Sequence, residues 1–323
     1  MTVYSARARR RGTPRRVLAA ATALAVSAVL AGTVSPADAT TSGQAAPPCA
    51  LTSATPLALQ YPHQAPPAAS LLHRLADRLR PVPSDTDTGR YAYARLRMQA
   101  ADSTFDDPCV VTLTAHANEE RWRADDGSGQ VTGTPWHLDP AHPPAVETTV
   151  YPAGELPGVV AGPVPTDPAA LAAALDAATN SVQATDARVR PLGAADNARR
   201  QRHTGTAARV RAVADLNAWH CTDRLARRAV LLVLADVARL AYRGTVAGYP
   251  GAFAVSVDSD DWRDILVLDR VTGVVLAYEQ VLLRNGQPLG VRTPYMNART
   301  VYAGRGRSSR AGVAPSHDST GQP

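Results

Sequence analysis

The stretch DRLARRAVLLVLADVARLAYRGTV, residues 223–246, decides the fold. Thr222 or Asp223 is a suitable N-cap, and apolar residues then recur at helical spacing. The middle of this helix, residues 229–235, is apolar on every side. A helix of that kind must be buried on more than one side. We therefore expect the helix from Asp223 to Leu240 to lie across a sheet.

The residues after this helix read as strands. Apolar runs rich in Val, Leu and Ala alternate with turns that contain Gly, Pro or Asp, which is typical of an antiparallel meander. Strands are expected at residues 241–246, 253–258, 264–268, 274–283 and 295–302.

The chain before this helix combines helices with further strands. Asp167 and Pro168 form an N-cap and first-turn pair for a helix, and helical spacing resumes from Val210. Helices are also expected over residues 68–80, and strands over residues 91–100, 110–117 and from Glu119 or Glu120 to 124. The order of these signals predicts an α+β fold, a curved antiparallel sheet with helices packed on its concave face.

Composition divides the chain into segments. Residues 1–39 are expected to be a signal peptide, residues 40–66 a flexible lead-in, and residues 67–303 the folded domain. Residues 179–205 are Arg-rich with few large apolar residues and predict a disordered insertion, while residues 304–323 predict a disordered tail.

The first segment has the features of an export signal. Six Arg precede an uncharged run over residues 17–36, and small residues at Ala37 and Ala39 predict cleavage after Ala39 and a secreted protein. An uncleaved anchor helix is the alternative, and Arg15-Arg16 leaves the general secretory and the twin-arginine routes both open. Without the signal, 28 Arg face 27 acids, so the remaining chain has a net charge of +1.

Charge and residue types exclude several functions. The chain has no Lys, which excludes a phosphate-gripping P-loop lysine and a Schiff-base lysine. The excess Arg lies in residues 186–211 and in the tail, without aromatic residues among it, so nucleic acid is not an expected partner. No nucleophile elbow or metal-binding spacing occurs, so we expect no catalytic residues, no metal and no cofactor.

Three cysteines follow the predicted signal. Cys49, Cys109 and Cys221 allow three single pairings in an oxidising compartment and leave one thiol over. Cys49 with Cys109 is the favoured disulfide, because Cys109 opens a strand and Cys49 lies in a segment that could reach it. Three unpaired thiols are the alternative.

Four segments carry a resemblance to a family. They are YAYARLR at residues 91–97, ERWRADDGSG at residues 120–129, PTDPAAL at residues 165–171, and the helix and meander over residues 228–276. Taken in order, they resemble an uncharacterised actinobacterial family of extracytoplasmic proteins and, more distantly, the LolA-like half-barrel of lipoprotein carriers and of periplasmic sigma-factor regulators.

The resemblance implies an unclosed barrel with helices plugging a hydrophobic cavity. Such a cavity accepts acyl chains or a segment of a partner protein. Family members typically keep a membrane anchor and a cytosolic part. Because only a signal is recognised in this chain, a direct role in transmembrane signalling is not expected.

The sequence therefore predicts a secreted, non-enzymatic protein that binds a hydrophobic ligand, a lipid or an envelope protein. Membrane association would come only through the uncleaved signal or a lipid ligand. A filled core that docks a partner through sheet edges is the first alternative, and a hydrolase with sequence-distant catalytic residues is the second. The expected cavity lining is Ala92, Ala94, Leu96, Met98, Val111, Leu113, Leu232, Val255, Leu266 and Leu268.

Overall fold

The computed structural model describes residues 55–104, 111–156, 160, 162–189, 206–259, 262–284, 287–288 and 295–315. The predicted signal, the favoured Cys49–Cys109 disulfide and residues 190–205 of the predicted insertion lie outside these ranges. Cys221 is described, and it is a half-buried free thiol.

Two of the described helices begin at the capping residues that the sequence predicts. The helices are α1 (Ala69–Arg78), the one-turn helix η1 (Pro83–Asp85), α2 (Pro168–Val189), α4 (Thr206–Trp219) and α5 (Arg224–Ala235). Asp223 is the N-cap of α5, where its Oδ1 accepts a hydrogen bond of 2.8 Å from the N–H of Ala226. Asp167 accepts one of the same length from the N–H of Ala170 at the start of α2.

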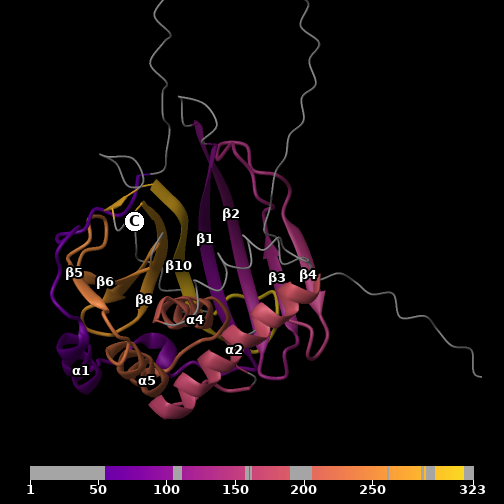
Figure 1. The fold of residues 1–323 in the computed structure, drawn as a ribbon. Helices are drawn as coiled ribbons and strands as arrows, with labels where there is room; N and C mark the ends of the chain where they lie inside the picture. Colours follow the sequence, from indigo (N-terminus) through magenta and orange to yellow (C-terminus); the bar gives the residue numbers. More distant parts are fainter. Residues whose placement is uncertain are drawn as a thin grey trace, which may run out of the picture. The chain divides into compact units, whose positions relative to one another are not determined.

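The strands form a large antiparallel sheet (Figure 1), which confirms the α+β class. The strands are β1 (Tyr91–Thr104), β2 (Val111–Ala124), β3 (Gly129–Gly133), β4 (Glu147–Tyr151), β5 (Ala241–Gly244), β6 (Ala252–Asp258), β7 (Trp262–Asp269), β8 (Val275–Arg284), β9 (Gln287–Pro288) and β10 (Tyr295–Ser308). Their order is β4-β3-β2-β1-β10-β8-β7-β6-β5, with β9 paired to β8.

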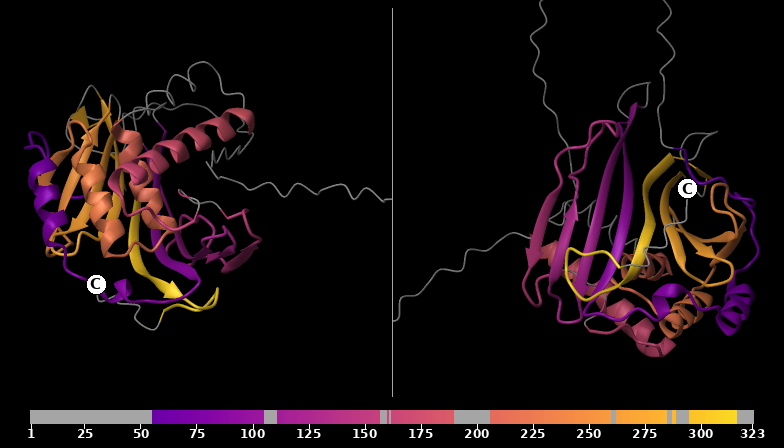
Figure 2. Two further views of the ribbon diagram at one scale, coloured as in Figure 1. Left: turned by 90° about the horizontal axis from the view of Figure 1, so that it is seen from below. Right: turned by 180° about the vertical axis from the view of Figure 1, so that it is seen from behind.

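The first strand of the chain pairs with the last. β1 lies between β2 and β10, so the early strands β1–β4 and the late strands β5–β8 are joined only through β1 and β10 along the sheet. Figure 2 shows this succession of strands from two further directions. Helix α4 contacts β1 and β2 of the early half and also β6, β7 and β8 of the late half.

Side chains on the two faces of the sheet belong to two separate apolar clusters. One face, here called the inner face, shares its cluster with α1, α2, α4 and α5 and includes Leu96 of β1, Val255 of β6 and Leu266 of β7. The opposite, outer face carries a smaller cluster that includes Ala254 and Ile265. This division follows from the alternation of side chains along each strand.

The lead-in is more ordered than the sequence predicts. Residues 55–66 lie along the late half of the sheet, where Leu57 and Leu59 pack on the outer cluster. The N–H of Gln60 donates to the carbonyl of Thr245, and the N–H of Tyr242 donates to the carbonyl of Pro66. The expected start of the domain at residue 67 is therefore too late.

The C-terminal boundary also differs. β10 continues to Ser308, although we expected the tail to begin at residue 304. Beyond β10, the indole Nε1 of Trp122 donates a hydrogen bond of 2.9 Å to the carbonyl of Val313. A Cβ added at Gly306 would lie 2.7 Å from Cγ of Pro315, so these residues pack closely. The C-terminal segment up to Pro315 is part of the fold.

Three further expectations were wrong in detail. Residues 111–124 form the single strand β2 instead of two strands. Residues 147–151 form β4, although no strand is predicted there. Helix α2 continues to Val189, although we placed the start of a disordered insertion at residue 179.

Candidate functional site on the inner face

The predicted cavity lining is largely covered by the helices. Five of the ten residues are fully buried in the inner cluster: Ala94, Leu96, Val255, Leu266 and Leu268. Met98 and Leu232 are half-buried and pack against the same cluster, and Ala92 is buried beside it. Val111 and Leu113 lie in β2, but their side chains lie outside the described part. Seven of the ten residues therefore belong to or pack against one apolar cluster, which helical side chains share with the strands.

Polar side chains interrupt this apolar face at Asp264. Its carboxylate is fully buried and receives two hydrogen bonds from the guanidinium of Arg211, at 2.9 and 3.0 Å. The hydroxyl of Tyr278 donates to the same carboxylate at 2.5 Å, and the Gln280 amide donates at 3.3 Å. Desolvation and then the charge of Asp264 raise the pKa of Tyr278 well above its usual value. This network joins α4 to β7 and β8.

Asp215 lies one helical turn after Arg211 and has an unusual environment. The residue is exposed, yet desolvation raises the pKa of its carboxyl group to about 6, against the opposing charges of Arg121 and Arg211. A residue can be partly exposed to solvent while many protein atoms surround its carboxyl group, and those atoms then desolvate the carboxylate. Asp215 is therefore an exposed residue with many protein atoms around its carboxyl group.

Four arginines lie in two rows on the inner face of β2, β1 and β10. Arg123 and Arg307 flank Ala92 in one row, and Arg121 and Arg305 flank Ala94 in the next. Alanine is the residue between the two arginines in both rows. The long cationic side chains of the four arginines therefore lie on either side of the methyl groups of Ala92 and Ala94.

The contacts of these arginines differ. Arg121 pairs with Glu119 at 2.6 Å and its guanidinium lies 3.8 Å from the ring centre of Trp219 in α4. Arg305 donates to Oδ1 of Asn217 at 2.8 Å and to the carbonyl of Val275. Arg123 donates to the carbonyl of Val160 at 3.1 Å, and Arg307 donates to the carbonyl of Gly89 at 3.0 Å. Only Arg121 has a carboxylate partner among these four in the described part of the chain.

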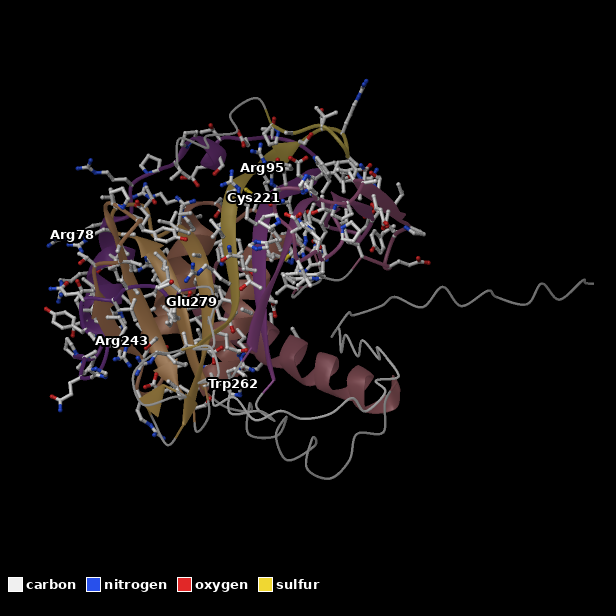
Figure 3. The ribbon with its side chains drawn as sticks, turned by 90° about the horizontal axis from the view of Figure 1, so that it is seen from above. Arg78, Arg95, Cys221, Arg243, Trp262 and Glu279 are labelled. Carbon is white, nitrogen blue, oxygen red and sulfur yellow. The ribbon has the colours of Figure 1, made fainter. Side chains whose placement is uncertain are left out.

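His220 and Cys221, which follow α4, lie among these arginines. Figure 3 labels Cys221. Desolvation, followed by the charges of Arg123 and Arg307, lowers the pKa of His220 to about 3. Desolvation raises the pKa of the Cys221 thiol to about 11, although Arg305 and Arg307 oppose this shift. At neutral pH, His220 is an uncharged imidazole and Cys221 is a protonated thiol, so neither is poised for nucleophilic or acid-base chemistry.

The described ranges hold neither a metal-binding cluster nor a membrane-spanning helix. No group of three or more His, Cys, Asp or Glu side chains there could hold a metal ion. None of the helices in that part is both long and apolar enough to cross a membrane. No Ser or Cys side chain described there shares a hydrogen bond with a His. The acidic hairpin turn at Asp126 binds its own loop instead, because Asp126 accepts hydrogen bonds from the N–H and hydroxyl of Ser128.

The alternation of residues along β2 and β10 would have predicted that these arginines lie in pairs on one face of each strand. Arg121 and Arg123 alternate with Trp122, and Arg305 and Arg307 alternate with Gly306, so each pair occupies one face of its strand. The second pair fell in the expected tail, and only the pairing of β10 with β1 places it opposite the first.

Comparison with known proteins gave no relative: no protein-family model, curated protein or solved structure matches the chain. The function of the chain must therefore be inferred from the geometry of the inner face.

Proposed function

We propose that this chain is an exported, non-enzymatic protein that binds a hydrophobic ligand between its helices and the inner face of a LolA-like half-barrel. The ligand would be an acyl chain, a lipid or an amphipathic segment. Export rests on the signal predicted at residues 1–39. The half-barrel would place the inner face on the concave side, with α4 lying along it.

The sheet order and the contacts of α4 support this architecture. Because β1 and β10 join two halves of the sheet, and α4 contacts strands of both halves, a bend of the sheet around α4 would account for all of these contacts. Ala92 and Ala94 are small residues on this face, so a guest would have to displace the neighbouring side chains only slightly to reach the sheet there.

The observation that carries the proposal is the environment of Asp215. An exposed carboxylate that is nevertheless desolvated supports an opening beside α4, on the face that also carries the largest apolar cluster. Tyr278 is half-buried and desolvated, and it packs against the same cluster. An apolar guest entering there would meet Leu96 and Leu266 once α4 shifts.

The free-energy cost of displacing a helix restricts the ligand to molecules with a large apolar surface. Each 100 Å² of apolar surface exposed by a displaced helix costs about 2.5 kcal/mol, and a guest must return a similar amount through its own contacts. A small polar molecule cannot supply this. An acyl chain or the apolar face of a peptide helix can, because its apolar area is comparable with that of the helix face it replaces.

Ligand binding can be tested by purifying the exported protein without detergent and recording native mass spectra. The protein is then delipidated and titrated with the fluorescent fatty acid cis-parinaric acid. We expect copurified lipid and saturable binding. A bare mass together with no binding of the fatty acid would reject the proposal.

A matched pair of variants locates the ligand. Ala94→Leu fills space on the inner face, and Ala254→Leu makes the same change in the outer cluster. We expect Ala94→Leu to weaken fatty-acid binding at least fivefold and Ala254→Leu to leave it within twofold of the unmodified protein. Equal effects of the two changes would place the ligand elsewhere.

One observation favours a second function, docking of a partner protein at a sheet edge. β4 ends the sheet order, four of its five residues are exposed, and Val150 is 72% exposed. An exposed edge strand can pair with a strand of another protein. Replacing Val150 of β4 with Pro would remove a backbone donor from this edge, because Val150 lies opposite Gln130, whose own backbone groups face β2. A partner bound through β4 would be lost in this variant, whereas fatty-acid binding would be unchanged.

A further inference from the structure

Three arginines of the inner face lack the partner that the other strongly buried arginines have. The guanidinium groups of Arg123, Arg305 and Arg307, here called the arginine cluster, have no carboxylate within 4.0 Å in the described part of the chain. Arginines elsewhere with side chains at most a quarter exposed each pair with an acid: Arg121 with Glu119, Arg211 with Asp264, Arg227 with Asp85, Arg243 and Arg263 with Asp258, and Arg299 with Glu279.

Several buried nitrogen atoms in and beside the arginine cluster also lack a hydrogen-bond partner. Nε of Arg123 and Nε of Arg305 are buried and have no hydrogen-bond partner, and neither has Nε2 of His220. Arg123 is only 5% exposed and His220 only 4%. Buried polar atoms are almost always paired in folded proteins, and a buried charge without a counter-ion is strongly unfavourable. Buried arginines that lack both hydrogen-bond partners and a counter-ion indicate that a negatively charged acceptor is missing.

The cross-strand register brings the three cations to neighbouring positions of the sheet. Arg123 and Arg307 lie on either side of Ala92, and Arg305 lies opposite Ala94, two positions further along β1. The charges of Arg123 and Arg307 act on His220, and those of Arg305 and Arg307 act on Cys221, where Asp87 opposes them. One anion above these alanines is the simplest shared partner for the three guanidinium groups.

The acceptors bound by the guanidinium groups of Arg123 and Arg305 are uncharged. Arg123 donates to the carbonyl of Val160, and Arg305 donates to Asn217 and Val275. Three acids lie near the cluster without an ion pair to its guanidinium groups: Asp87 accepts from the backbone N–H of Arg307, and Asp125 and Asp126 act on Arg123 from a distance. The C-terminal end of α4 adds only a partial negative charge beside Arg121 and Arg305.

We propose that Arg123, Arg305 and Arg307 bind a phosphate group, and that this phosphate is the headgroup of the hydrophobic ligand. Guanidinium groups recognise phosphate oxygens through paired, charge-assisted hydrogen bonds. The cluster borders Ala94 and Leu96 of the inner apolar cluster, so the head and the tail of one amphiphile would occupy adjacent parts of β1. The headgroup assignment rests on the function proposed above, whereas phosphate binding by the cluster does not.

Calorimetric titration with three probes tests this inference: inorganic phosphate, dihexanoylphosphatidic acid, and dihexanoylglycerol, which lacks the phosphate. We expect the phosphatidic acid to bind at least tenfold more tightly than the glycerol. The double variant Arg123→Gln/Arg307→Gln should reduce this ratio to less than twofold. The control Arg224→Gln/Arg310→Gln, which removes the same charge from exposed positions, should keep it.

The outcomes separate the two proposals. Equal binding of the phosphatidic acid and the glycerol would overturn phosphate recognition and leave a hydrophobic ligand supported. Binding of inorganic phosphate that requires the cluster, without binding of either amphiphile, would support the phosphate site, assign it to free phosphate, and overturn both the headgroup assignment and the proposed function. Equal losses in the cluster variant and the control would overturn the site.

Discussion

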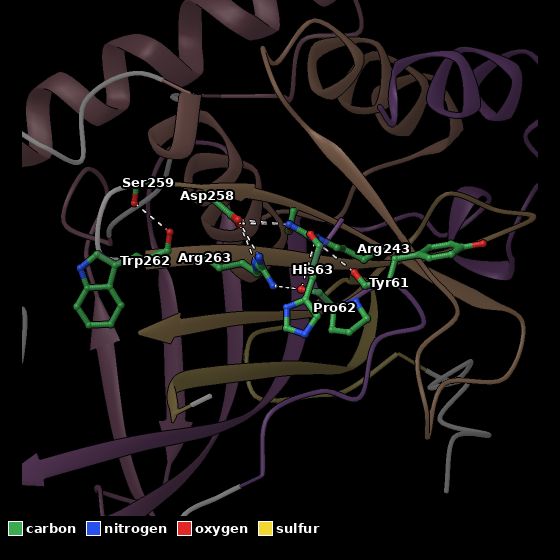
Figure 4. A network of polar contacts seen from close by, with 9 residues as sticks. Tyr61, Pro62, His63, Arg243, Asp258, Ser259, Trp262 and Arg263 are labelled. Carbon is green, nitrogen blue, oxygen red and sulfur yellow. Dashed lines mark hydrogen bonds and ion pairs between the residues drawn. The ribbon is translucent and has the colours of Figure 1, made fainter. Parts of the chain in front are cut away.

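The arginine cluster of the inner face and the arginines of the outer face have opposite surroundings. On the outer face, Arg243 and Arg263 share Asp258 and also donate to backbone carbonyls of residues 61–63 (Figure 4). Arg299 pairs with the buried Glu279 and donates to the carbonyl of Thr55. On the inner face, the guanidinium groups of the arginine cluster have no carboxylate partner in the described part of the chain. The outer arginines complete a structural clamp on residues 55–63, whereas the cluster is complete only with an anion from outside.

The largest expected effect comes from breaking an outer pair. Arg299→Leu leaves the fully buried carboxylate of Glu279 without its cation and should lower the free energy of unfolding by about 3–5 kcal/mol in urea denaturation. Desolvation already raises the pKa of Glu279, and an acid with a raised pKa destabilises the fold when it must ionise. The loss should therefore be larger at pH 8 than at pH 5.

The double variant Arg299→Leu/Glu279→Leu is the matched control. Removing both charges should recover most of the lost stability, because no unpaired ion remains. If the single variant is as stable as the unmodified protein, the outer pair is not a structural clamp.

A somewhat smaller loss is expected from Asp258→Asn. This change leaves Arg243 and Arg263 without a carboxylate, but the side chain of Asp258 is 36% exposed, so water replaces part of the interaction. We expect the free energy of unfolding to fall by about 2 kcal/mol. Limited proteolysis should also cut residues 55–63 faster, because the two arginines hold that segment. An unchanged cleavage rate would contradict the clamp.

The inner face should make stability depend on pH through His220. Its pKa is about 3 in the folded chain, against 6.5 for an ordinary His, so the unfolded chain binds the extra proton between these values. Stability is therefore lost as the pH falls below 6.5. Between pH 7 and pH 5 this contributes a loss of about 2 kcal/mol. The variant His220→Gln should show a loss that is smaller by this amount, as measured by urea denaturation at each pH. Identical pH dependence in the two proteins would show that His220 is not held neutral.

The smallest effect should come from the arginine cluster itself in buffer without phosphate. Arg123→Met removes a cation that has no carboxylate, so the free energy of unfolding should stay within about 1 kcal/mol of the unmodified value or increase. Arg263→Met on the outer face, where Asp258 loses a partner, should be the more destabilising of the two. The reverse order would remove the distinction between the faces.

Local sequence patterns predicted the elements whose stability is largely local. Asp167 and Asp223 cap helices as expected, and β6, β7 and β8 lie within two residues of their predicted ranges. These segments carry caps, turn residues and alternating apolar side chains, all of which are visible without knowledge of the tertiary structure.

Elements that depend on distant partners were predicted poorly. The polar stretch around Asn118 suggested a break, yet β2 stays continuous because each of its residues pairs with β1. Gly304 and Gly306 carry no apolar pattern, and their strand forms because β10 pairs with β1 and because Trp122 binds the segment beyond it. The arginine cluster is created by the same long-range pairing, so it could not be located from the sequence before the sheet order was known.

The most direct test of the central claim is the free energy of unfolding as a function of phosphate concentration at constant ionic strength. An anion that binds only the folded protein stabilises it by RT ln(1 + [L]/Kd), about 2.7 kcal/mol at a hundred times Kd. We predict that phosphate stabilises the unmodified protein in this manner, and that the dependence is lost in Arg123→Gln/Arg307→Gln but kept in Arg224→Gln/Arg310→Gln. The same phosphate dependence in all three proteins, or none in the unmodified one, would contradict the claim.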